Sequence, residues 1–325
     1  MRSTRVTLST AVAVALGALV AAAVTSPARP AHPAHPGEPR SAVAAAATAD
    51  VTARSTTVLD DRPTEAEQLV LSRAEQVLIK ECMARRGLPY WVEPAADPDE
   101  LRPLGYVLDD VRWASTHGYG SRITARADRA RESDPNSAHR RGLSDRARAE
   151  YTEALSGGPD TPVLSAELPG GGTIRSRLGG CEAHAQQRLY GPREPWFKVE
   201  KIALNLAPLY VPQLVRDERF VASQRSWARC MGEAGRPYPE PGPARADVPR
   251  LTAGLAPDEA FAAEVRLAVT EAECAERSGF GALARHLEDE YRAGLRERYG
   301  AELDTYDRLR RAAVERAREV VDGSS

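Results

Sequence analysis

Cys82-Met-Ala-Arg-Arg-Gly-Leu-Pro-Tyr90 and Cys230-Met-Gly-Glu-Ala-Gly-Arg-Pro-Tyr238 share the nonapeptide pattern Cys-Met-x-x-x-Gly-x-Pro-Tyr. A glycine five residues after the cysteine predicts a helix end, because glycine adopts the left-handed conformation found there at little cost. The proline and tyrosine that follow predict an extended exit from the helix. We therefore expect two related helices, each with a cysteine near its end, and two related halves, 63–192 and 193–325.

Helical patterns dominate the rest of the chain. Thr64 and Glu67 form a capping box that predicts the start of the first helix. The last 40 or so residues carry an apolar residue at almost every fourth position from Leu283 to Tyr306, and no proline interrupts them. The expected fold is thus an all-α helical bundle of two related halves with a long C-terminal helix. One short β-hairpin is expected around Pro169–Gly172, and a polar segment is expected up to Leu143.

The C-terminal helix is expected to dock on the bundle only in part. Its first residues, Leu283–Leu295, carry a stripe of leucine and tyrosine that needs cover. Beyond Tyr306 the stripe contains mostly small residues, which bury little apolar area. The sequence therefore predicts that the last turns project as an arm that contacts a partner.

The N-terminal residues resemble an export signal. Arg2 and Arg5 precede the apolar run Val6–Val24, and small residues suited to cleavage follow, so we expect residues 1–28 to be a signal peptide. An uncleaved membrane anchor is the alternative interpretation of the same run. Residues 29–62 are rich in proline and alanine and are expected to form a disordered linker. No membrane span is expected in the mature chain, and the localisation expected is secreted or extracytoplasmic.

Four cysteines in an exported protein predict disulfides. The repeat favours pairs within each half, Cys82 with Cys181 and Cys230 with Cys274. Pairing across the halves, Cys82 with Cys230, also respects the repeat and stays open. A redox site and a zinc site are both disfavoured, because no Cys-x-x-Cys is present and the cysteines are far apart in sequence. No metal site is expected.

The charges of the chain are balanced. Lysine and arginine number 44 and aspartate and glutamate 46, for a formal net charge of −2. Acidic residues are interleaved with arginines, so the sequence predicts no basic face and no nucleic-acid partner. No motif indicates a cofactor, and none is expected.

The most distinctive segment without cysteine is His117-Gly-Tyr-Gly120, which follows the carboxylate pair Asp109 and Asp110. A histidine beside acidic residues suits acid–base chemistry, so His117, Asp109 and Asp110 are candidate catalytic residues. The alternative, which we favour, is structural: His117 at a helix end packs on Trp113, and the aspartates cap the helix start.

Five segments resemble a family of uncharacterised actinobacterial exported proteins with paired Cys-Met-x-x-x-Gly motifs. They are Tyr106–Trp113, His117–Gly120, Asp134–Asn136, Gly179–Cys181 and Trp227–Met231. The resemblance covers nearly all of 63–325 and implies a secreted protein with paired cysteines, but no activity.

We therefore expect an exported, disulfide-stapled helical protein that binds an unknown protein or cell-envelope partner and is not an enzyme. An extracytoplasmic hydrolase with a site near His117 is the alternative.

Overall fold

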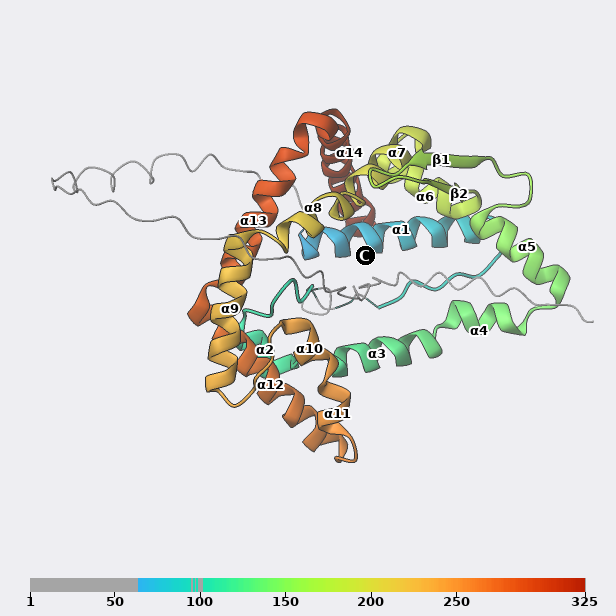
Figure 1. Ribbon diagram of the computed structural model, residues 1–325. Helices are drawn as coiled ribbons and strands as arrows, with labels where there is room; N and C mark the ends of the chain where they lie inside the picture. Colours follow the sequence, from blue (N-terminus) through green and yellow to red (C-terminus); the bar gives the residue numbers. More distant parts are fainter. Residues whose placement is uncertain (1–63, 95, 97, 99–101, 325) are drawn as a thin grey trace, which may run out of the picture. The chain divides into compact units, whose positions relative to one another are not determined.

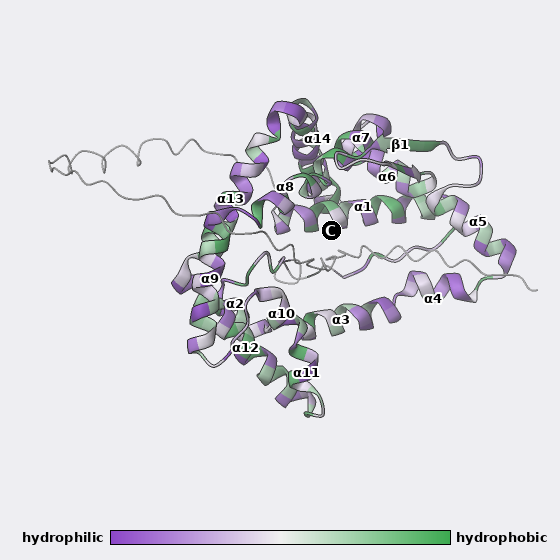
Figure 2. Cartoon of the chain, in the orientation of Figure 1, coloured by the Kyte–Doolittle hydropathy of each residue, from purple (hydrophilic) through white to green (hydrophobic). Residues whose placement is uncertain are grey.

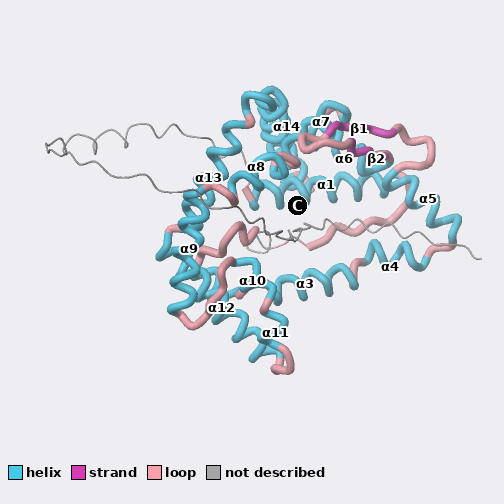
Figure 3. Tube along the Cα trace, viewed as in Figure 1, coloured by secondary structure: helices cyan, strands magenta, loops and turns pink. Residues whose placement is uncertain are grey.

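The computed structural model describes residues 64–94, 96, 98 and 102–324. Almost all of the regular structure in this part of the chain is helical, with one two-stranded antiparallel sheet (Figures 1 and 3). The predicted all-α fold, with its short hairpin and long C-terminal helix, is confirmed. The predicted signal peptide, 1–28, and linker, 29–62, lie outside the described residues and stay predictions.

Helices follow one another along the described chain and are interrupted by a short hairpin. The helices are α1 Glu65–Arg85, α2 Val111–His117, α3 Ser121–Glu132, α4 Pro135–Gly142, α5 Asp145–Ser156, α6 Gly180–Tyr190, α7 Arg193–Ala203, α8 Ala207–Leu214, α9 Glu218–Glu233, α10 Pro241–Ala246, α11 Val248–Thr252, α12 Pro257–Ser278, α13 Phe280–Gly294 and α14 Arg296–Asp322. The strands are β1 Val163–Glu167 and β2 Thr173–Arg177, paired with Ala166 opposite Ile174. Helices α3 and α4 lie in the polar segment up to Leu143, where the sequence analysis identified no helix. Asp134 caps α4, and Pro135 occupies its first position.

The two nonapeptides adopt the same local structure at the ends of α1 and α9. Gly87 and Gly235 have φ angles of 71° and 73°, the left-handed conformation that glycine adopts most readily. In the first copy the Leu88 N–H donates to the carbonyl of Met83 at 3.0 Å. In the second copy the Arg236 N–H donates to the carbonyl of Met231 at 2.8 Å. Each bond satisfies a carbonyl that the helix end would otherwise leave unpaired.

The extended exits are held in related ways. The Gln76 side chain on α1 accepts from the N–H of Glu93 at 2.7 Å, and the Gln224 side chain on α9 donates to the carbonyl of Pro239 at 3.4 Å. These glutamines occupy the same position relative to their cysteines. The likeness therefore extends beyond the nonapeptide, whereas the duplication of whole halves stays a prediction.

Each predicted half contains one disulfide, which joins two cysteines of that half. Cys82 on α1 pairs with Cys181 at the start of α6, and Cys230 on α9 pairs with Cys274 near the end of α12, each with a Cα–Cα distance of 5.6 Å. Closing loops of this length disfavours the unfolded chain, by up to about 4–5 kcal/mol in the chain-entropy treatment. Disulfides of this kind are typical of proteins outside the reducing cytoplasm.

Each disulfide is part of a separate hydrophobic core. The first core contains Cys82 and Cys181 and is built from α1, α5, α6 and α14. The second contains Cys274 and is built mainly from α8, α9, α12 and α13. Both cores cross the predicted boundary between residues 192 and 193, because α14 completes the first and Val107 joins the second. Most helices show both hydrophobic and hydrophilic residues, as expected when only one face is covered (Figure 2).

The C-terminal segment differs from the prediction in two ways. It forms two helices that meet at Leu295, which ends α13 and precedes α14. The projecting arm is also wrong, since Ala313, Val314 and Ala317 are at most 3% exposed in the first core. Small side chains let two helices approach closely, so residues that bury little area each still serve a tight contact between α14 and α1.

An ion pair reinforces the contact between α14 and α1. Arg310 on α14 donates to the Glu67 carboxylate at 2.7 Å, and the Arg310 side chain is only 7% exposed. Burial by itself raises the pKa of Glu67, but the hydrogen bonds from Arg310 and from the Thr64 N–H outweigh it and hold the pKa below its usual value. The same carboxylate completes the capping box of α1. The start of α1 is thereby tied to the end of the chain.

No helix among the described residues is both long and apolar enough to cross a lipid bilayer.

We predict that a chain ending at Tyr306 is strongly destabilised. It lacks the part of α14 that covers α1, so the first core is exposed to water. The melting temperature, followed by circular dichroism, should fall by more than about 10 °C, as expected for a loss of several kcal/mol in a domain of this size. A control chain that lacks only residues 323–325 should melt within about 2 °C of the parent. Equal melting temperatures for all three chains would mean that the segment after Tyr306 is not part of the core and projects as an arm.

Candidate functional site

The segment His117-Gly-Tyr-Gly120 lies against α12 and is held there by a buried carboxylate. Glu264 on α12, 4% exposed, accepts hydrogen bonds from the N–H groups of Tyr119 at 2.7 Å and Ser121 at 3.2 Å, and from the Ser121 hydroxyl. Gly118 has a φ of 62°, and a Cβ there would lie 2.8 Å from a carboxylate oxygen of Glu264. Glycine is therefore required at 118 both by its conformation and by the approach of Glu264.

A second carboxylate, two turns further along the same face of α12, also holds this segment. Glu271 is fully buried and accepts from the Leu108 N–H at 2.9 Å and from the Tyr119 hydroxyl at 2.7 Å. Arg245 on α10 donates to Glu271 at 2.7 Å and balances its charge. Arg245 also donates to the carbonyls of Gly105 and Leu104. The carboxylate therefore joins the loop before α2, the segment after it, and α10.

The environment of Tyr119 shows the electrostatic effect of this arrangement. Burial raises the pKa of the Tyr119 phenol well above its usual value, and the negative charge and hydrogen bond of Glu271 raise it further. The phenol is thus kept protonated as a donor. It serves as a fixed link to Glu271, because an ionised phenol would face a carboxylate at hydrogen-bond distance.

The three predicted catalytic residues lie near α2 but have separate surroundings. The His117 ring is half-buried and packs on the Trp113 ring, with centroids 5.0 Å apart. Asp110 caps α2 by accepting a hydrogen bond from the Trp113 N–H at 2.8 Å, and it accepts another from the Arg102 guanidinium at 2.7 Å. Asp109 accepts from Arg285 on α13 at 2.5 Å. The described contacts of the aspartates are those of helix capping and ion pairing, and the catalytic role considered for these three residues stays a prediction.

The pKa of Asp110 is lowered, first by the hydrogen bond from the Trp113 N–H and then by Arg102, against the opposing effect of burial. A carboxyl that is held ionised in this way is a poor proton donor near neutral pH. The structural role that the sequence favoured for His117 stays a prediction.

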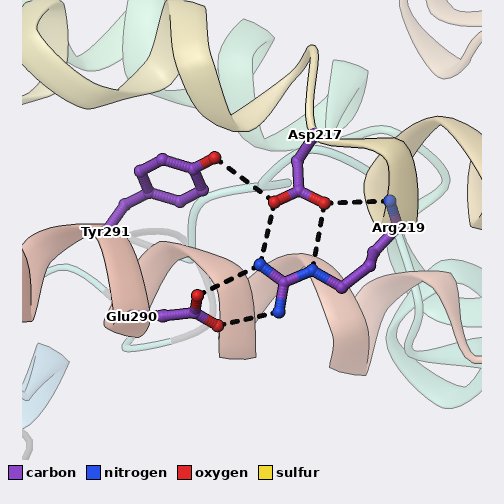
Figure 4. A network of polar contacts seen from close by, with 4 residues as sticks. All are labelled: Asp217, Arg219, Glu290 and Tyr291. Atoms are coloured by element: carbon purple, nitrogen blue, oxygen red, sulfur yellow. Dashed lines mark hydrogen bonds and ion pairs between the residues drawn. The ribbon is translucent and has the colours of Figure 1, made fainter.

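A small pocket of about 270 Å³ lies between α8 and α13. Its lining residues are Leu209, Tyr210, Gln213, Glu290, Tyr291, Gly294 and Leu295. Figure 4 shows that Arg219 lies between the carboxylates of Asp217 and Glu290, and that the Tyr291 hydroxyl points at Asp217. The hydrogen bond from Arg219 is the main cause that lowers the pKa of Asp217 and of Glu290. Two polar groups of the pocket lining, Glu290 and Tyr291, are thus already bound to Arg219 and Asp217.

An open groove of about 460 Å³ lies on α4 and α5 and has a different character. It is lined by Ser137, Arg140, Arg141, Arg148 and Thr152, with no carboxylate among them. The sequence predicted no basic face because acids and arginines alternate along the chain. Folding has nevertheless gathered three arginines from two helices along one groove.

Sequence reasoning did not find Glu264, Glu271 or Arg245. A usable signal was present, because the two glutamates occupy the same stripe of α12 as the buried residues Leu267, Ala268, Ala272 and Ala275. A carboxylate inside an apolar stripe at helical spacing predicts a buried and paired acid. Its partners, however, lie 26 to 163 residues away in sequence.

Across the described ranges, no group of three or more histidine, cysteine, aspartate or glutamate side chains is arranged to hold a metal ion. Comparison of the chain with models of protein families, with curated proteins and with solved structures finds no match.

We predict that Glu271→Gln lowers the free energy of unfolding by about 3–5 kcal/mol, because it leaves Arg245 beside a neutral group inside the protein. Urea unfolding followed by circular dichroism would measure the change. Glu273→Gln on the exposed face of the same helix is the matched control and should change stability by less than about 0.5 kcal/mol. If both variants unfold alike, Glu271 does not organise this region.

Proposed function

We propose that this protein is exported and acts outside the cytoplasm by binding a component of the cell envelope, without catalysing a reaction. The observation that carries the proposal is that Glu264 and Glu271, the buried carboxylates beside the segment after α2, serve as hydrogen-bond acceptors that hold the structure together. Glu264 and Glu271 are occupied by hydrogen bonds from three main-chain N–H groups, two hydroxyls and one arginine. Groups bound in this way organise a loop, and moving a proton to or from them would disrupt it.

Two further observations support export and binding. The Cys82–Cys181 and Cys230–Cys274 disulfides fit an extracellular protein, since the cytoplasm keeps thiols reduced. The groove on α4 and α5 is open to solvent and lined by hydrogen-bond donors, a composition suited to an anionic ligand. We also propose that the chain belongs to the family of actinobacterial exported proteins with paired Cys-Met-x-x-x-Gly motifs. Such a membership is consistent with export.

We predict that the full-length chain, produced in an actinobacterial host, is recovered outside the cytoplasm with no titratable thiol. Intact-mass measurement should show loss of about the first 28 residues. The protein should sediment with isolated cell envelopes at physiological salt. A control chain without residues 2–28 should stay in the cytoplasm and contain free thiols.

Recovery of the full-length chain in the cytoplasm would contradict export, and failure to sediment with envelopes would contradict the binding role. A hydrolytic activity of the purified protein that is lost in His117→Ala, with the fold retained, would favour the hydrolase instead.

A further inference from the structure

We propose that the groove formed by Arg140, Arg141 and Arg148 is a binding site for the phosphate groups of a phosphodiester polymer. The inference rests on the proposed binding function and names the ligand chemistry. All five residues of the groove carry side-chain donors, and three of them are guanidinium groups with five N–H donors each.

The number of donors favours phosphate over carboxylate. A guanidinium presents two parallel N–H groups that match two oxygens of either anion. A carboxylate accepts hydrogen bonds at about four lone-pair positions, all in the plane of its two oxygens. The two charged oxygens of a phosphodiester are arranged tetrahedrally about phosphorus and accept from more directions, so one phosphate can use arginines from both α4 and α5 together with the Ser137 hydroxyl.

Two of the arginines are already held in position. Arg148 on α5 donates to the carbonyl of Arg140 at 3.0 Å and to the carbonyl of Leu143 at 2.8 Å, across the turn between the helices. It also forms an ion pair with the exposed carboxylate of Asp145 at 3.4 Å. Arg140 donates to the Ser137 hydroxyl at 3.2 Å. Side chains fixed before binding lose less conformational entropy when the ligand arrives.

Arg141 is the arginine that is available to a ligand. It is exposed and has no hydrogen-bonded or ion-paired partner among the described residues. Its charge adds to those of Arg140 and Arg148, and the segment 137–152 that carries the groove contains four arginines against two acidic residues. This local excess of positive charge contrasts with the net charge of −2 for the whole chain and attracts an anion to this place.

The helix that carries Arg140 and Arg141 is firmly anchored. Asp134 caps α4 by accepting from the N–H groups of Asn136 and Ser137 at 3.0 and 2.8 Å. The side chain of Asn136 pairs with both the N–H and the carbonyl of Trp91, at 2.9 and 2.8 Å. The His139 ring lies between the rings of Trp91 and Tyr151. These contacts keep the groove in one geometry and connect it to the exit of the first nonapeptide.

Isothermal titration calorimetry of the mature protein tests the site with three probes: inorganic phosphate, an oligomer of glycerol phosphate, and polyglutamate of the same charge. We expect the oligomer to bind at least tenfold more tightly than polyglutamate, and binding to weaken as salt is added. Arg141→Gln should weaken binding of the oligomer at least tenfold. Arg146→Gln is the matched control, because it removes the same charge from the exposed surface of α5 outside the groove, and it should weaken binding less than twofold.

Each outcome bears on the proposal. Equal weakening by Arg141→Gln and Arg146→Gln would overturn it, because binding would then depend on overall charge. Equal binding of polyglutamate would also overturn it. Inorganic phosphate binding as tightly as the oligomer would keep the phosphate site but replace the polymer by the free ion as its ligand.

The sedimentation experiment separates this inference from the proposed function. If Arg141→Gln loses the oligomer but still sediments with envelopes, the protein binds envelopes through another surface and the groove is not the contact. If the parent binds the oligomer but no envelope, the phosphate site stands and the envelope function fails. Unchanged melting of Arg141→Gln would show that the variant is folded.

Discussion

The second core depends on one buried charge. Glu271 is fully buried, and an ionised carboxylate in that position is costly unless its oxygens are hydrogen-bonded and its charge is balanced. Arg245 balances the charge, while Leu108 and Tyr119 provide further donors. The main-chain carbonyl of Glu271 also accepts from the Trp227 indole at 3.2 Å. One residue of α12 therefore positions two loops, α9 and α10.

The first core depends on a different constraint, the packing of helix α14 on helix α1. The segment of α14 with Ala313, Val314 and Ala317 packs on α1, and Arg310 reaches Glu67 in its first turn. The Cys82–Cys181 disulfide ties the opposite end of α1 to α6. Helix α1 is thus held at both ends by segments distant in sequence. This arrangement explains why the described residues past 306 belong to the fold and are not an appendage.

These two constraints also affect where ligands can bind. Glu264 of α12 is occupied by hydrogen bonds from within the protein, Glu271 is paired with Arg245, and Arg219 pairs with both Asp217 and Glu290, so these groups hold elements in place. In the groove, Arg141 has no partner within the described residues, and Arg148 combines an ion pair with the exposed Asp145 with hydrogen bonds to two carbonyls. An incoming anion therefore gains most from the groove on these two helices.

The sequence by itself determined the features that depend on near neighbours. The Thr64 capping box, the glycine ends of α1 and α9, the short hairpin and the helical class were all predictable, because each rests on residues within a few positions of one another. The within-half disulfides were favoured from the repeat.

Tertiary structure decided the features that depend on distant partners. The spacing of Glu264 and Glu271 on α12 shows only that both lie on one face, whereas the donors that make their burial possible come from residues 108, 119, 121 and 245. From the sequence, the small residues of α14 predict a weak contact. In the structure they are buried against α1, because small side chains let the two helices approach closely. Alternating charges conceal the arginine groove, because a turn between two helices brings Arg140, Arg141 and Arg148 to one place. Sequence patterns report the face that a side chain occupies, and only the folded chain decides what that face meets.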